Sequence, residues 1–177
     1  MALPDTLKVT PGTAVIWGEA GAAGVTLTLS LDALADATAR MGAYADLGAS
    51  WDMDYSVMLV VETGTAPTAG LTASLYMVCT HSTSYWPGGV TGSDAAWPAD
   101  SNEDEWALQL GAPAVTLVAT NDGNVTQVQQ PVIWRPSGRY VTPVVDNNLG
   151  QAFRDQATAS NNTSRVILIP LAVQVTD

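Results

Sequence analysis

Asp52 and Asp54 come closest, in residue type and spacing, to a catalytic pair in this chain. Side chains two residues apart on an extended chain lie on the same side, so both carboxyl groups could face one substrate. Glycoside hydrolysis uses two carboxyl groups roughly 5 to 9.5 Å apart across a cleft. The same residues also suit a solvated loop that leads into a strand, and we favour that interpretation. A glycan hydrolase that uses Asp52 and Asp54 is therefore the weakest of our functional hypotheses.

A second acidic run, DSNEDE at 100–105, contains Glu103, Asp104 and Glu105. Carboxylate oxygens are the ligands that Ca²⁺ prefers, so this run is the best calcium candidate. It lacks the regular ligand spacing and the glycine of an EF-hand loop. We therefore expect neither a metal nor another cofactor.

The other reactive side chains do not form a catalytic set. His81 is the only histidine and Cys79 the only cysteine, too few for the usual zinc sites. Ser82 and Ser84 lie close to His81, but the GxSxG turn that exposes a nucleophilic serine is absent. The glycines of GGVTGS at 88–93 precede neither a lysine nor a helix, unlike those of a phosphate-binding loop. We expect no enzymatic activity, and we expect Cys79 to be a small core residue.

Tryptophan is the other residue type here that could carry function, with six copies in the chain. Trp106 and Trp134 fall in strand-like segments, and we predict that they lie in the core. Trp86 and Trp97 are each followed by proline in a long irregular segment, residues 80–104. Aromatic side chains on loops stack on sugar rings or anchor protein interfaces, and they also pin a loop to its own sheet. Both interpretations of Trp86 and Trp97 stay open.

The elements that must position these residues are strands. Apolar residues alternate in 55–62 and in 71–79, and the segment between them is rich in Pro and Gly. We predict that these two strands form an antiparallel hairpin with its apolar side inward. The Ala-rich stretch 32–50 is interpreted as a long loop with at most one helical turn. Further strands are predicted at 13–17, 25–31, 105–110, 114–120, 124–134, 139–145 and 164–175.

Two of these strands carry further signals. An Asp-Gly pair at 122–123 indicates a hairpin between its flanking strands. Pro131 cannot donate a backbone hydrogen bond, so the strand at 124–134 is expected to be an edge strand or to be bulged there. The strand at 164–175 places one row of apolar side chains on one face: Ile167, Ile169, Leu171, Val173 and Val175.

About eight or nine strands, with no long helix and no internal repeat, predict an all-β protein. An antiparallel two-sheet sandwich of the jelly-roll type closes this number of strands. Residues 1–12 hold two prolines and little pattern, and we expect them to form an extended N-terminal arm. Residues 13–177 are expected to form a single sandwich domain with long loops.

Charge and hydropathy exclude several classes of partner. The formal charge is −11, from 17 acidic residues against six Lys and Arg, which disfavours binding to nucleic acid and to anionic membranes. The N-terminus lacks a basic segment followed by an apolar one, and no apolar run approaches the roughly 20 residues of a transmembrane helix. We therefore expect a soluble product of the cytoplasm that is not secreted.

Several segments resemble one group of tailed-phage virion structural proteins. They are LADATARMGAYADLG (34–48), APTAG (66–70), LTASLYMV (71–78), GGVTGSDAAW (88–97) and the C-terminal YVTPVVDNNLGQAF…SRVILIPLAVQV. In that group a stretch similar to LADGAGRQ precedes two strands, and a loop similar to GxTGSDAAY follows the second. The similarity covers about four fifths of the chain.

The resemblance implies a jelly-roll capsid decoration (cement) protein, displayed on the capsid surface after synthesis in the host cytoplasm. It implies a homotrimer whose partners are its own copies and the major capsid protein, and it brings no catalytic residues. We expect the interface to involve Leu3, Pro4, Leu7 and Val9 of the arm and Trp86 and Trp97 of the long loop. Arg40 and Asp46 are candidates for an ionic clasp within their loop. The alternative is a tail or fibre protein that binds host cell-surface glycan through Trp86 and Trp97.

Overall fold

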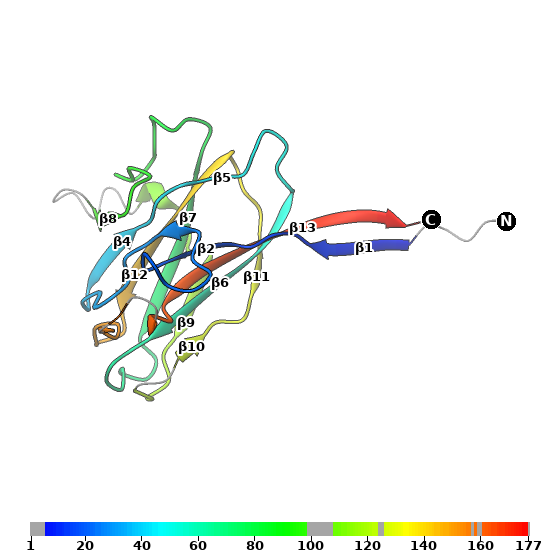
Figure 1. Ribbon diagram of the computed structural model, residues 1–177. Helices are drawn as coiled ribbons and strands as arrows, with labels where there is room; N and C mark the ends of the chain where they lie inside the picture. Colours follow the sequence, from blue (N-terminus) through cyan, green and yellow to red (C-terminus); the bar gives the residue numbers. More distant parts are fainter. Residues whose placement is uncertain (1–5, 99–107, 124–125, 157, 159–160, 177) are drawn as a thin grey trace.

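The computed structural model describes residues 6–98, 108–123, 126–156, 158 and 161–176. In this part of the chain thirteen strands form two sheets, which pack face to face as a sandwich (Figure 1). The only α-helical residues described are 108–110. The predicted all-β, two-sheet sandwich is therefore confirmed. No helix among the described residues is long and apolar enough to cross a membrane.

The first sheet, sheet A, has seven strands in the order β10-β6-β13-β2-β3, with β1 paired to β13 and β11 paired to β6. All of its pairs are antiparallel except β2 with β3. Its strands are β1 (Thr6–Pro11), β2 (Val15–Gly18), β3 (Leu27–Thr28), β6 (Asp54–Glu62), β10 (Thr126–Val128), β11 (Val132–Trp134) and β13 (Arg165–Thr176).

The second sheet, sheet B, has six strands in the order β8-β4-β12-β7-β9, with β5 paired to β12. All of its pairs are antiparallel. Its strands are β4 (Thr38–Met41), β5 (Ala45–Asp46), β7 (Thr72–Thr80), β8 (Ala95–Trp97), β9 (Val115–Val118) and β12 (Tyr140–Asn148).

The chain passes repeatedly from one sheet to the other. It leaves sheet A after β3, β6 and β11, and it returns from sheet B before β6, β10 and β13. The principal strands consequently lie in the orders β2-β13-β6-β10 and β4-β12-β7-β9. This is the jelly-roll arrangement of two interlocked antiparallel sheets, and it leaves neighbouring strands far apart in sequence.

The alternating residues of β6 and β7 line the core between the sheets. Tyr55, Val57, Leu59 and Val61 of β6 are buried in the same cluster as Ala73, Leu75 and Met77 of β7. The predicted inward sides are confirmed, but the predicted hairpin is wrong, since β6 pairs with β13 and β7 pairs with β12. Alternation determines which side of a strand is buried, and it carries no information on the hydrogen-bonding partner.

A second predicted hairpin is also wrong, for the same reason. The Asp-Gly pair at 122–123 lies between β9, which pairs with β7, and β10, which pairs with β6. The turn residues mark a crossing between sheets instead of a hairpin. Pro131 lies between β10 and β11, both of which pair with β6, so the strand is interrupted there as expected.

Three further segments differ from their sequence predictions. The stretch 32–50 contains β4 and β5 and no helix, because pairing with β12 overrides the helix propensity of alanine. Only Leu27–Thr28 of the predicted strand 25–31 is a strand. In the predicted strand 105–110, the described residues 108–110 are helical. Trp106 lies outside the described residues, whereas Trp134 lies in β11 and packs on the core as predicted.

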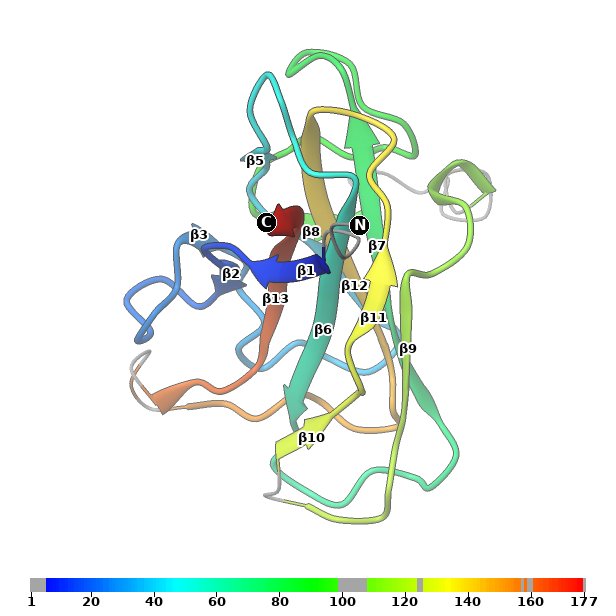
Figure 2. The same ribbon diagram turned by 90° about the vertical axis from the view of Figure 1, so that its right-hand side faces the viewer.

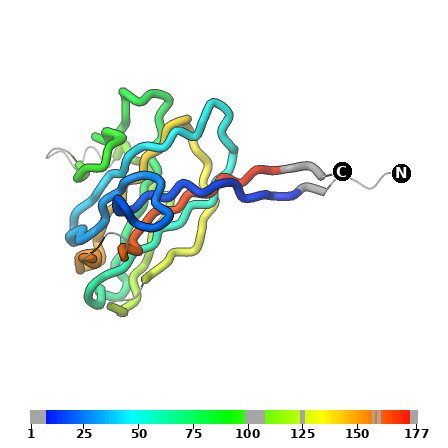
Figure 3. Tube along the Cα trace, viewed as in Figure 1, coloured from blue at the N-terminus to red at the C-terminus, as the bar shows by residue number. Residues whose placement is uncertain are grey.

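The N-terminal and C-terminal strands form a ribbon that leaves the sandwich. β1 pairs with β13 from Pro11, opposite Leu171, outward to Thr6, whereas the pairing of β6 with β13 reaches only to Asp54, the first residue of β6, opposite the same Leu171 (Figures 1 and 3). Residues 6–11 of the predicted arm are therefore one strand of a two-stranded ribbon. Among the residues that the structure describes, those of β13 past Leu171 pair only with β1.

Candidate functional site

The long loop after β7 covers the outer side of sheet B. Its described part, up to residue 98, includes β8, which adds to the edge of the sheet beside β4. A small second hydrophobic core, separate from the main one, lies between this loop and sheet B. Packing against this core fixes the shape of the irregular segment. The buried members are Ala39, Met41, Val78, Val90, Trp97 and Val144, with Tyr76, Trp86, Ala95 and Leu110 packed against them.

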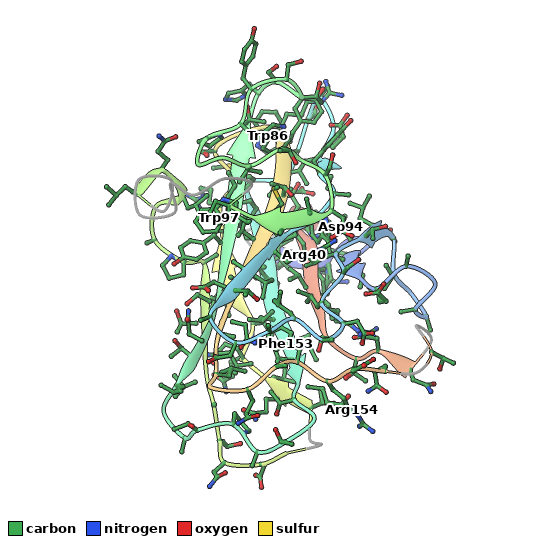
Figure 4. All side chains as sticks on the ribbon, turned by 90° about the vertical axis from the view of Figure 1, so that its left-hand side faces the viewer. Arg40, Trp86, Asp94, Trp97, Phe153 and Arg154 are labelled. Carbon is green, nitrogen blue, oxygen red and sulfur yellow. The ribbon has the colours of Figure 1, made fainter. Side chains whose placement is uncertain are left out.

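Trp97 pins this loop to the sheet. It lies in β8 opposite Ala39 of β4, only 7% of its surface is exposed, and its indole Nε1 donates to the Gly88 carbonyl at 2.6 Å. A buried indole needs such a partner because an unpaired N–H would be costly. Of the two interpretations of Trp97, the structure therefore supports the anchor and not the exposed contact residue (Figure 4).

Trp86 is half-buried against the same small core. Its Nε1 donates to the Thr83 carbonyl at 3.2 Å, and its ring lies over Gly92. Gly92 has a φ of 72°, which residues with a side chain rarely adopt. A Cβ at this position would also stand 2.9 Å from the indole ring of Trp86, which is too close. In the TGSDAAW stretch, the position beneath the Trp86 ring therefore requires glycine. The neighbouring Tyr85 is strongly exposed.

Asp94 connects the loop to two distant segments. Its carboxylate accepts from the Ser30 backbone N–H at 3.0 Å, from the Ser30 hydroxyl at 2.6 Å and from Arg40 Nε at 2.8 Å. Burial by itself would raise the pKa of Asp94, but these hydrogen bonds outweigh it and lower the pKa below its ordinary value. Figure 4 shows Arg40 and Asp94 side by side at the junction of β4 with the loop.

The clasp predicted between Arg40 and Asp46 is replaced by two other ion pairs. Arg40 pairs with Asp94, as described above, and Asp46 pairs with Arg139, whose Nε and Nη2 each donate at 2.6 Å. The Arg139 hydrogen bonds, together with the Gly48 backbone N–H, lower the pKa of Asp46 to about 2. Both predicted residues are used in ionic contacts, but their partners come from loop residues next to β8 and β12, which only the tertiary structure brings close.

An aromatic surface lies where β5, β12 and the loop meet. The Tyr44 ring is 6.0 Å from that of Trp86 and 5.7 Å from that of Tyr140, which it meets nearly edge-on. The guanidinium of Arg139 lies 5.1 Å from the centre of the Tyr140 ring. Tyr44 is exposed, as is Tyr85 nearby in the loop. We call Tyr44, Tyr85, Trp86 and Tyr140 the aromatic end of the molecule.

The sequence analysis missed a buried polar hub at the end of β6. Glu62 is buried and binds Arg154, which is labelled in Figure 4, the Thr163 hydroxyl at 2.5 Å and the Gln156 amide at 3.2 Å. Burial would raise the pKa of Glu62, but the hydrogen bonds from Thr163 and Arg154 outweigh it, and the pKa is lowered. In the sequence Glu62 ends an apolar run, and nothing there points to partners about a hundred residues later.

The remaining chemical candidates do not come together in the described residues. Asp54 is bound by Arg135 through Nε at 2.9 Å and Nη2 at 2.7 Å, so it is a structural ion-pair partner. His81 lies 6.2 Å from the Trp51 ring, and Cys79 packs half-buried on the main core, as predicted. No three His, Cys, Asp or Glu residues form a metal-binding group in the part of the chain that is described. The acidic run 100–105 lies outside that part.

The predicted arm contacts are only partly visible. Leu3 and Pro4 lie outside the described residues. Leu7 belongs to β1, in register with Val175. Val9 is 56% exposed on the ribbon, so its side chain is accessible in a single copy.

Comparison with known proteins adds no identification. No protein-family model matches the chain, and the searches of curated proteins and of solved structures found no significant match.

Proposed function

We propose that this protein is a structural component of a tailed-phage virion, a capsid decoration protein that binds the assembled head lattice as a homotrimer and stabilises it. The observation that carries the proposal is the place of the phage-like segments in the fold. LADATARMG contains β4, GGVTGSDAAW ends in β8, and these strands pair across the edge of sheet B. Ala39 lies opposite Trp97, and Arg40 binds Asp94.

These contacts support the resemblance because they give its residues a common physical role. The loop packs on the sheet only when both motifs, 34–48 and 88–97, are present, although they lie about fifty residues apart in the sequence. The jelly-roll arrangement is also the one that the resemblance implies. Arg40, Asp94, Gly92 and Trp97 act within the chain, so the proposal assigns them a positioning role and assigns partner contact to exposed surface.

The proposal is tested with the purified chain and with expanded, undecorated heads of its phage. Light scattering should give a mass near three times 18.4 kDa. The protein should sediment with the heads and raise their thermal transition, since a ligand that binds only the intact lattice stabilises it by mass action. A monomer that stays in the supernatant would rule out a decoration role.

A second candidate is favoured by the aromatic end. Exposed Tyr44 and Tyr85 beside Trp86 present ring faces and edges of the kind that stack on sugars. A tail or fibre protein that binds host glycan would use this surface. Its test is the intrinsic tryptophan fluorescence, to which Trp86 contributes as one of six tryptophans, compared in wild type and Tyr85→Ala on adding host polysaccharide. No change in either protein, with a flat glycan array, counts against this candidate.

A further inference from the structure

The outer side of sheet A is unusually apolar for a side that faces away from the core. In an antiparallel sandwich that side is normally polar, because only the inner side is buried. On β13, Val166 and Leu168 point into the main core, so Ile167 and Ile169 belong to the outer side. Ile167 lies between Ile16 and Met58 of the neighbouring strands.

The apolar rows continue from the sheet onto the ribbon. Ile169 shares its row with Ser56 and with the exposed Ile133. The next row joins Leu171 to Pro11, and the one after it joins Val173 to Val9. Figure 2 looks along the ribbon onto sheet A and shows that the ribbon rises from the middle of this side.

The ribbon itself has one apolar and one polar side. Val9 and Val173, paired across the ribbon, are 56% and 62% exposed on the apolar side. Lys8 directly precedes Val9 in the chain and therefore belongs to the opposite, polar side, because successive residues of a strand alternate. A two-stranded ribbon is only marginally stable in water by itself. The rest of the chain supplies no third strand beyond Leu171 in the described residues.

The charges indicate what covers this surface. We infer that the other copies of this chain in the proposed homotrimer pack their equivalent apolar sides against the one formed by Ile133, Ile169, Leu171, Val173 and Val9. The chain carries a formal charge of −11, so two copies repel wherever acidic residues meet. Asp54 is the acidic residue in these rows, and Arg135 binds it at 2.7 Å. This side therefore brings copies together without opposing negative charges, whereas it offers nothing to a strongly charged partner.

This inference rests on the homo-oligomer in the proposed function and names the surface that forms it. It predicts that Val9→Asp or Val173→Asp dissociates the oligomer, because a carboxylate would be buried without a partner. The dissociation constant should rise roughly 100-fold or more, and the mass should fall toward 18.4 kDa. The matched control is Val118→Asp on β9 of sheet B, where Val118 is also 56% exposed.

The measurement is light scattering or sedimentation across a dilution series, with circular dichroism to show that each variant folds. A covalent check uses Val173→Cys, which should form an intermolecular disulfide on oxidation, while Val118→Cys should not. A wild-type protein that is monomeric at high concentration overturns the inference. So does an oligomer that survives Val9→Asp and Val173→Asp, or one that Val118→Asp disrupts equally.

Binding to phage heads is measured separately on the same wild-type protein. An oligomer that Val9→Asp dissociates but that ignores the heads would refute the decoration role and leave this interface standing. An oligomer that binds heads and is unaffected by Val9→Asp would refute this interface and leave the decoration role standing. The two proposals therefore fail in distinguishable ways.

Discussion

Replacing Asp94 by asparagine tests whether the long loop after β7 is held by its ionic contact with the sheet. The substitution keeps the size and shape of the side chain and removes the charge. Oδ1 can still accept from the Ser30 backbone N–H and from Arg40, while the new amide group stands 2.6 Å from the Ser30 hydroxyl, which must then turn to accept. The loss of stability therefore reports the removal of the charge, because the substitution leaves no cavity.

The size of the effect follows from these three bonds. A hydrogen bond to a charged group contributes about 1.5–3 kcal/mol and a neutral one about 1 kcal/mol, so we expect Asp94→Asn to cost about 2–3 kcal/mol of unfolding free energy. The pair is shielded, since 17% of the Asp94 side chain and 28% of that of Arg40 are exposed. In a domain of this size, that loss lowers the melting temperature by roughly 5–10 °C.

Calorimetry and urea unfolding at neutral pH measure this loss. The control is Asp46→Asn, since Asp46 also accepts two bonds from an arginine, but its side chain and that of Arg139 are about 40% and 38% exposed. Solvent screens such a pair, so the control should lose much less stability. A double-mutant cycle with Arg40→Gln isolates the coupling between Arg40 and Asp94.

The pH dependence gives an independent check. Because the pKa of Asp94 is lowered in the folded protein, its contribution is complete above the ordinary value of 3.8 and is lost as the pH falls through the lower folded value. The difference between wild type and Asp94→Asn should therefore stay constant at neutral pH and shrink below about pH 4. The reasoning would be refuted if Asp94→Asn lost no more stability than the control Asp46→Asn. It would also be refuted if the losses of Asp94→Asn and Arg40→Gln simply added up in the double mutant.

Three other outcomes are expected. Glu62→Gln should destabilise the protein most near neutral pH, where the lowered pKa keeps the wild-type carboxylate charged; urea unfolding at pH 7 and at pH 3 should show a loss that is smaller in acid. Trp97→Ala should cost about 3–5 kcal/mol in the same assay, because it empties a buried site, whereas Tyr85→Ala, a change to an exposed side chain, should change stability little. Burial raises the pKa of Cys79, so its thiol should react with a disulfide reagent much more slowly in the native protein than in urea; equal rates would contradict this.

The sequence by itself determined the fold class and the buried side of several strands. Alternation in 55–61 and 73–77 identified core residues because side chains of a strand point alternately to its two sides. Turn residues such as Pro67 and Gly70 correctly marked where strands end. These are local properties of the chain, and tertiary contacts do not reverse them.

Only the tertiary structure decided which strands pair and which side chains meet. β6 pairs with β13 and not with its neighbour β7, since a jelly roll joins strands that are distant in sequence. For the same reason Arg40 binds Asp94 instead of Asp46, and Glu62 finds Arg154. The outer apolar rows of β13 also depended on pairing. Alternation indicated one row of apolar side chains on β13, but only the register of the sheet decided which residues of β1, of β6 and, beyond β6, of β11 continue each row.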